Sequence, residues 1–349
     1  MISIILSISA NGQINFKSLR FDEDYSQLKK DTMRDWYSQM KYNTIIKNQD
    51  LYISQGGEVR YQFQHFTNED WGLSPSRSYN SFYTRFLYHS DLYISKKSRL
   101  FAQLNSTFSV GRITPVRPID QNELDIQQIF FDVMTDSNII IRVGRQELLY
   151  GSQRLISVRE GPNNRQSYDA LKIVWHHKDF RFDAYYSHPV RIRQGILNDY
   201  FNRREQLWSA YAVFNNLLFL KNLDIYYIGY FNINKTYSSG EGKEYRHSIG
   251  SRIWGKSANW KYDFEALYQL GTWSNQQIHA YTASIDASYT LFKFKTKPSF
   301  GFKTEIISGD RNRLDNQLNT FNPLYPRGAY FGLAALIGPS NLIDFHPSF

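Results

Sequence analysis

Polar and apolar side chains alternate in the stretch Trp260-Lys261-Tyr262-Asp263-Phe264-Glu265-Ala266-Leu267-Tyr268-Gln269-Leu270. Every even position is apolar, whereas Lys261, Asp263, Glu265 and Gln269 occupy odd positions. Successive side chains of a β-strand point to opposite faces of the sheet. The stretch therefore predicts a strand with one apolar face and one polar face.

The same period of two recurs along most of the chain. Val59, Tyr61 and Phe63 alternate with polar residues in the stretch 53–65. The pattern predicts further strands at residues 82–94, 100–110, 124–133, 138–143, 168–175, 180–187, 207–214, 223–231, 245–254, 281–289 and 300–306, with another beginning after residue 329. We count about thirteen strands and the start of another.

The predicted connections alternate in length. Short polar turns, such as residues 95–98 and 135–138, follow every second strand, and the other strands are followed by longer segments such as 68–79, 112–123 and 234–243. Transmembrane β-barrels have short periplasmic turns and long outer loops. A soluble sandwich has no reason to sort its loops in this way. The pattern favours an all-β fold, an antiparallel transmembrane β-barrel.

Composition permits this fold and narrows the function. The 349 residues are 17% aromatic, with 26 Tyr and 25 Phe, and the mean hydropathy is -0.51. No run of about 18 apolar residues could form a membrane helix. A secreted sandwich or propeller would share much of this composition. Because the chain contains no Cys, disulfides, thiolate nucleophiles and Cys-bound metals are excluded.

The N-terminal part differs from the rest. Residues 1–12 form a short apolar stretch ending in small residues, typical of the tail of a secretory signal, although an ordinary N-terminal strand is the alternative. Residues 13–50 are polar and lack periodicity, so we expect a periplasmic leader. Residues 51–349 then hold the barrel.

If the apolar face meets lipid, the alternate face lines a pore. That face carries many charged side chains, with arginine favoured over lysine, and a planar guanidinium can hold a carboxylate with two hydrogen bonds. Such a lumen would attract anions, in agreement with a formal charge of +9. Alternatively, these charges pair across the lumen and rigidify the wall. The predicted lumen residues include Glu58, Arg60, Arg85, Arg142, Lys172, Arg181, Asp183, Asp224, Arg246, Arg252, Lys261, Asp263, Glu265, Lys303 and Glu305.

Other function classes find no support in the sequence. No Ser-centred elbow, Walker loop or zinc-binding His pair is present. No nucleic-acid motif is present, and Lys and Arg are scattered among aromatics. We expect no enzyme activity, no cofactor and no metal. A carbohydrate-binding β-protein without transport activity, either outer-membrane or secreted, is the alternative function.

Residues 144–155 join two predicted strands through a glycine-bounded crossing, which continues as a polar loop to residue 166. This predicts a strand end at the mouth of the barrel, with Arg142 facing the lumen just below it. Simple alternation would point Arg145 at lipid, which is costly for a charge. Either a bulge next to Gly144 turns Arg145 inward, or the strand has already left the bilayer.

Four groups of segments resemble a known family. The first is FDEDY at 21–25, with MKY at 40–42; the second is SQGGEVRY at 54–61, with WG at 71–72. The third is GRQEL at 144–148 with GSQRL at 151–155, and the fourth is SGD at 308–310, FNPLYP at 321–326 and YFG at 330–332. Together these segments resemble the alginate export family of outer-membrane barrels.

The resemblance implies a monomeric barrel of about 18 strands in the cell outer membrane. Because we count only about thirteen strands and the start of another, the resemblance also implies that the barrel of residues 51–349 is truncated at its C-terminus. It implies outward passage of an anionic polysaccharide such as alginate, or of another small anionic solute, with periplasmic export partners. The residues that match a selectivity constriction are Arg60, Arg85 and Arg142, with Arg145 on the same segment. With Glu58, Arg246, Arg252 and Lys303, these residues form the predicted pore-lining, anion-binding set.

Overall fold

A computed structural model describes residues 16–30, 35–46, 51–69, 77–312, 315–328 and 338–349. Helical structure in these residues is confined to short N-terminal segments, and none of their helices has the length and apolar character needed to cross a membrane. The N-terminal elements are η1 (Arg20–Asp22), η2 (Ser26–Lys30), α1 (Trp36–Lys41) and β1 (Asn43–Thr44).

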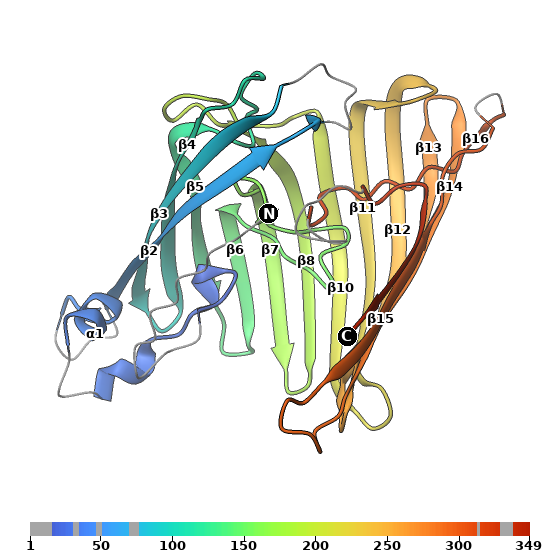
Figure 1. The fold of residues 1–349 in the computed structure, drawn as a ribbon. Coiled ribbons are helices and arrows are strands. Elements are labelled where there is room, and N and C mark those ends of the chain that lie inside the picture. Colours follow the sequence, from blue (N-terminus) through green and yellow to red (C-terminus); the bar gives the residue numbers. More distant parts are fainter. Residues whose placement is uncertain (1–15, 31–34, 47–50, 70–76, 313–314, 329–337) are drawn as a thin grey trace.

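One large sheet contains the remaining elements (Figure 1). Its first half consists of β2 (Tyr52–Phe66), β3 (Tyr79–Ser95), β4 (Ser98–Val110), β5 (Asn122–Met134), β6 (Ile139–Gln146), β7 (Tyr168–His177), β8 (Phe180–Arg191) and β9 (Tyr200–Phe201). Its second half consists of β10 (Glu205–Leu217), β11 (Lys221–Tyr237), β12 (Gly240–Ser257), β13 (Trp260–Trp273), β14 (Gln276–Thr290), β15 (Ser299–Ile307), β16 (Gln317–Leu318) and β17 (Leu342–Ser348).

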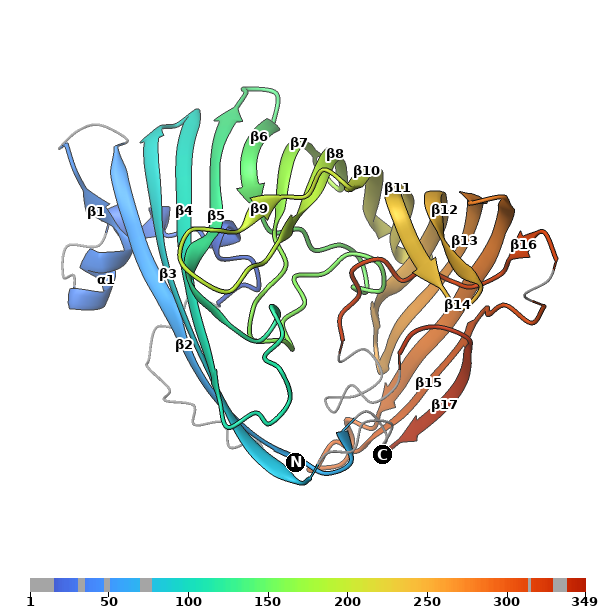
Figure 2. The same cartoon turned by 90° about the horizontal axis from the view of Figure 1, so that it is seen from above.

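The long strands pair antiparallel with their neighbours in sequence. Three of the seventeen strands, β1, β9 and β16, have two residues each, which leaves fourteen longer strands in the described part of the chain. Figure 2 shows this sheet curving around a central space. Within the described residues, the ladder of long antiparallel strands extends from β2, whose first residues also pair with β1, to β17. The predicted all-β antiparallel architecture is confirmed.

The two faces of the sheet differ as the alternation predicts. On β2, the side chains of Val59, Tyr61 and Phe63 are exposed on the outer surface. On β13, Glu265 and Gln269 are buried on the inner side. Leu267, which breaks the polar alternation, is also buried there and packs in the interior cluster. The outer face of the sheet, which meets lipid, is thus apolar, and the charged residues face the lumen.

Connection lengths follow the predicted rule with two exceptions. The sequence predicts a long loop at residues 234–243, but β11 and β12 continue through it as a hairpin, with Tyr237 paired to Gly240. The β13–β14 connection is equally tight, with Trp273 paired to Gln276. Gly240 has a φ of 138°, which only glycine adopts without strain. Regular cross-strand pairing therefore outweighs the loop-like composition Ser-Ser-Gly-Glu-Gly.

The crossing between β6 and β7 leaves the wall early. These strands have 8 and 10 residues, against 17 and 18 in β11 and β12. Residues 147–167 turn into the space enclosed by the sheet (Figures 1 and 2), where Leu148, Leu155 and Ile156 are buried. The sequence placed this crossing at the mouth, whereas the structure folds it into the lumen. We call residues 147–167 the lumen loop.

A second segment pairs with the lumen loop. The backbone amide of Ser157 donates to the Tyr325 carbonyl at 2.9 Å, and the Tyr325 amide donates to the Leu155 carbonyl at 2.9 Å. Tyrosines of the wall support this pair, and their hydroxyls donate to carboxylates, as from Tyr211 to Asp224 at 2.7 Å. The buried Tyr211 hydroxyl thus keeps a hydrogen-bond partner. One side of the lumen is a packed core.

At Gly144, the backbone of β6 lies close to that of β5. The φ of Gly144 is 128°, and an added Cβ would collide with the Ile129 carbonyl oxygen and lie 2.8 Å from the Phe130 Cα. We expect Gly144→Ala to lower the free energy of unfolding by about 2 kcal/mol, measured by urea unfolding in lipid vesicles. Gly161→Ala is the control, because nothing lies within 4 Å of that added Cβ. Equal stability of the two variants would contradict the described backbone.

Candidate functional site

The structure places most of the predicted pore-lining residues on the inner face but divides them among separate clusters. Glu58, Arg60 and Arg85 come together from the neighbouring strands β2 and β3, where Arg60 is paired with Arg85. The side chains of Arg85 and Arg246 are fully buried. The remaining inner residues are partnered elsewhere: Arg142 on β6, Arg246 and Arg252 on β12, and Lys303 on β15.

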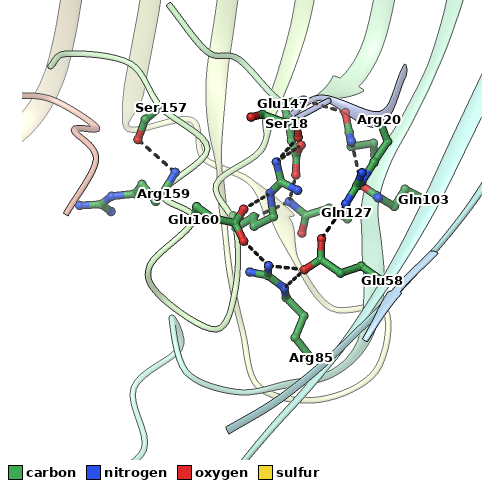
Figure 3. A network of polar contacts seen from close by, with 12 residues as sticks. Ser18, Arg20, Glu58, Arg85, Gln103, Gln127, Glu147, Ser157, Arg159 and Glu160 are labelled. Carbon is green, nitrogen blue, oxygen red and sulfur yellow. Dashed lines mark hydrogen bonds and ion pairs between the residues drawn. The ribbon is translucent and has the colours of Figure 1, made fainter. Parts of the chain in front are cut away.

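Arg85 is the centre of the first cluster (Figure 3). Its Nη2 contacts the Oε1 atoms of both Glu58 and Glu160, and its Nε donates to Glu58 Oε1 at 3.1 Å. Glu58 belongs to the wall, whereas Glu160 is carried by the lumen loop. The buried guanidinium is therefore held by one fixed carboxylate and one carboxylate from the loop.

Arg60 fixes the backbone of the same part of the loop. Its Nη1 donates to the Glu160 carbonyl oxygen at 2.8 Å, and its Nη2 donates to the Pro162 carbonyl oxygen at 2.8 Å. A carboxylate oxygen of Glu160 lies 3.7 Å from Nη1. Arg60 thus positions Glu160 beside Arg85.

The N-terminal segment enters the same cluster. Arg20 Nη2 donates to Glu58 Oε2 at 3.1 Å, and Arg165 Nη2 of the lumen loop donates to the Ser18 carbonyl at 2.7 Å. Arg165 also pairs with Glu147 at 3.0 Å and with Glu160 at 3.3 Å. Wall, N-terminal segment and lumen loop therefore meet. We call Arg20, Glu58, Arg60, Arg85, Glu147, Glu160 and Arg165 the loop-anchoring cluster.

Glu160 differs from its neighbours in exposure. Its side chain is 48% exposed, against 1% for Arg85 and 1% for Glu147. Burial raises the pKa of the Glu147 carboxyl, and the Arg165 guanidinium opposes that rise. Glu147 is locked in the interior, whereas Glu160 is a water-accessible carboxylate held against buried arginines.

Sequence reasoning missed four members of this cluster: Arg20, Glu147, Glu160 and Arg165. The leader and the long crossing lack strand periodicity, so the alternation of polar and apolar residues assigns none of their charges to the inner face. The only available signal was the concentration of charge at residues 159–165, Arg-Glu-Gly-Pro-Asn-Asn-Arg. That run does not reveal that the loop turns inward.

Arg142 has a positioning role in the structure. Its guanidinium makes a two-bond contact with Asp132, at 2.7 and 2.9 Å, and lies against the rings of both Phe21 and Phe130, 4.0 and 3.9 Å from their centroids. Cation–π contacts of this kind stabilise a desolvated guanidinium. Phe21 also packs against Phe101. Arg142 thus holds the N-terminal segment inside the wall.

The predicted residues of the second half also have partners. Arg246 pairs with Glu244 at 2.5 Å and donates to the Thr320 carbonyl at 3.2 Å, which anchors the segment that pairs with the lumen loop. Arg252 pairs with Asp263 at 2.5 Å. Lys303 is half-buried on β15, in register with Asp286 of β14. Arg246 is thus paired within β12 and Arg252 with the neighbouring strand β13, so these ion pairs run along the wall and do not cross the lumen.

Arg145 lies apart from these clusters. The register of β6 with β5 and β7 runs without a shift through Gly144, so no bulge turns the side chain. By parity Arg145 shares the outer face with Val143, and its Nε donates to Asp169 at 2.9 Å. The geometry does not support the predicted role of Arg145 in the pore, because the Arg145 guanidinium pairs with Asp169 on the outer face.

A loop between β8 and β10 packs beside Arg145. The backbone amides of Asn198 and Asp199 both donate to Asp125 Oδ2, at 2.7 and 2.8 Å, and Arg145 lies 3.8 Å from Asp125. Burial, together with the nearby Asp125 carboxylate, raises the pKa of Asp199 to about 6. The packing of this loop is therefore coupled to protonation of the Asp199 carboxylate.

No group of three or more His, Asp or Glu residues suited to a metal ion occurs in the part of the chain that the structure describes.

The chain is similar to a known protein family and to several solved structures. A family model described as alginate export matches residues 51–349, and no curated protein matches the chain. The chain is similar to OccK2 (OpdF) of Pseudomonas aeruginosa in complex with glucuronate, with 9% identity and a TM-score of 0.49 over 75% of this chain. It covers 65% of that protein, slightly less than two thirds.

Two further solved structures have comparable similarity. A BenF-like porin from Pseudomonas fluorescens Pf-5 has 10% identity and a TM-score of 0.49, with 74% of this chain and 67% of that one covered. Pseudomonas putida OprB has 10% identity and a TM-score of 0.43, with 74% and 75% covered.

The Asp199 loop yields a pH prediction. The folded-state pKa of about 6 exceeds the ordinary value of 3.8, so the docked loop retains a proton that the free loop releases between these values. Docking should become more stable as pH falls through that range and less stable as pH rises to 6. Amide exchange of residues 192–199, corrected for its intrinsic pH dependence, should therefore slow on acidification. Asp199→Asn should remove this dependence; an unchanged pH profile in the variant would contradict the assignment.

Proposed function

Because the chain belongs to the alginate export family of outer-membrane β-barrels, we propose that its lumen passes an anionic solute by diffusion. The solute in this proposal is an alginate-like polysaccharide, whose sugar units each carry a carboxylate. The loop-anchoring cluster supports the proposal because several of its guanidinium groups already hold carboxylates in one set of contacts. Arginine suits this task because its charge persists at every physiological pH.

The observation that carries the proposal is the position of Glu160. This half-exposed carboxylate contacts Arg85, lies 3.7 Å from Arg60 and pairs with Arg165 at 3.3 Å. A uronate carboxylate has the same charge and the same two oxygen acceptors. In the proposed mechanism, a solute carboxylate takes the place of Glu160 while Arg85 keeps its contact with Glu58.

The exchange avoids leaving a buried charge without a partner. Arg85 is 1% exposed, so its guanidinium needs a carboxylate at every stage. Glu160 is 48% exposed and is followed by Gly161, beside which an added Cβ would meet no atom within 4 Å. The Glu160 side chain therefore has room to turn to water, where hydration replaces its contacts with Arg60, Arg85 and Arg165. Conduction requires that the solute binds strongly enough to enter the channel and weakly enough to leave it.

The charge of the whole chain supports the same direction of selectivity. A formal charge of +9 raises the local concentration of anions around the lumen entrances. The four arginines of the cluster face its three glutamates, and Arg20 also pairs with Glu23 next to the cluster, so four guanidinium groups lie beside four carboxyl groups at rest. Displacement of Glu160 toward water is the step that offers positive charge to the solute.

Neutralising Glu160 should strengthen anion selectivity. In planar bilayers under a KCl gradient, we expect Glu160→Gln to shift the reversal potential toward that of chloride. We also expect it to tighten block by oligouronates by on the order of tenfold, since it removes the resident competitor. Asp136→Asn is the matched control, because it removes one negative charge from a short turn where the Asp136 side chain is 84% exposed.

Two results would overturn the proposal. The first is a cation-selective wild-type channel. The second is a Glu160→Gln channel that cannot be distinguished from Asp136→Asn in both reversal potential and block.

A further inference from the structure

Three neighbouring turns form one surface at the short-turn edge of the sheet, the lower edge in Figure 1. They are residues 218–221, 255–260 and 291–297, which we call the basic rim. The Tyr262 hydroxyl donates to the Leu220 carbonyl at 3.1 Å, which joins the first turn to the second. Lys256 Nζ lies 5.8 Å from the centroid of the Phe292 ring, which joins the second turn to the third.

The basic rim has a charge of one sign. It contains Lys221, Lys256, Lys293, Lys295 and Lys297, and none of its residues is Asp or Glu. The other short turns are mixed: Lys97 pairs with Asp136 at 2.6 Å, and Lys178 is followed by Asp179. Positive charge is thus gathered on the β10–β15 side of the edge and balanced on the β3–β8 side.

The same surface exposes large apolar side chains. Leu218 is 92% and Phe219 is 94% exposed, and Phe292 and Phe294 alternate with the lysines of the third turn. These side chains continue the apolar outer face of the wall, where Phe264 and Ile285 are also exposed. Apolar groups beside lysines suit a membrane interface, because lysine stems lie along apolar surface while the ammonium reaches the headgroups.

We propose that the basic rim binds the anionic headgroups of phospholipids in the periplasmic leaflet of the outer membrane. Short turns of outer-membrane barrels face the periplasm, so the rim meets that leaflet. The lysines bind lipid phosphates, and the phenylalanines and Leu218 enter the boundary between headgroups and acyl chains. Charge complementarity identifies the ligand class, since each ammonium near an anionic surface contributes to binding. The site is independent of the solute pathway.

Lipid selectivity tests this proposal with the full chain in vesicles. Spin-labelled phosphatidylglycerol and phosphatidylcholine report their relative association with the protein through the fraction of immobilised label. We expect wild type to prefer phosphatidylglycerol and added salt to weaken that preference. The variant K293Q/K295Q/K297Q should lose on the order of fivefold or more in relative association.

The control variant K178Q/K235Q/K243Q removes the same charge outside the basic rim and should keep the wild-type preference. Circular dichroism and heat-modified gel mobility verify that both variants fold. An equal preference in K293Q/K295Q/K297Q and wild type would overturn the proposal. So would a rim that captures an acidic periplasmic protein through these lysines without any preference among lipids.

Discussion

A guanidinium removed from water must be neutralised by nearby carboxylates, and Arg85 is such a group. One carboxylate, Glu58, lies beside it on the wall, and the second, Glu160, is supplied by the lumen loop. Buried charges of this kind are costly when a partner is missing. The need to neutralise Arg85 therefore links the inner face of the sheet to the lumen loop, which the sequence alone places at the mouth of the barrel.

Other parts of the interior depend on the same arrangement. Arg165 connects the lumen loop to the N-terminal segment, and Phe21 and Arg142 fasten that segment to β5 and β6. The pairing between Ser157 and Tyr325 fixes the other side of the loop. Most of these contacts are polar, and buried ion pairs specify an arrangement more than they stabilise a fold. The wall itself is held separately, by the backbone pairing of its long antiparallel strands.

The sequence predicted the wall better than the interior. Alternation is a local property, so strands such as Trp260–Trp273 and their apolar faces could be recognised without knowledge of their partners. The inward turn of residues 147–167 could not, because it depends on contacts with Arg60, Arg85 and Ser18, which are distant in sequence. Composition also misled at residues 234–243, where glycine and serine suit a loop but cross-strand pairing continues. For Arg142, parity identified the inner face but gave no sign of its two aromatic neighbours.

The claim that Glu160 of the lumen loop neutralises the buried Arg85 is tested most directly by the coupling free energy between these two residues. A double-mutant cycle with Arg85→Gln, Glu160→Gln and the double variant, followed by urea unfolding in vesicles, isolates their interaction from the effect of each change alone. The account predicts a coupling free energy of about 1–3 kcal/mol, because the two side chains are in contact. Additive effects of the two substitutions would contradict it, since they would place the lumen loop away from the wall.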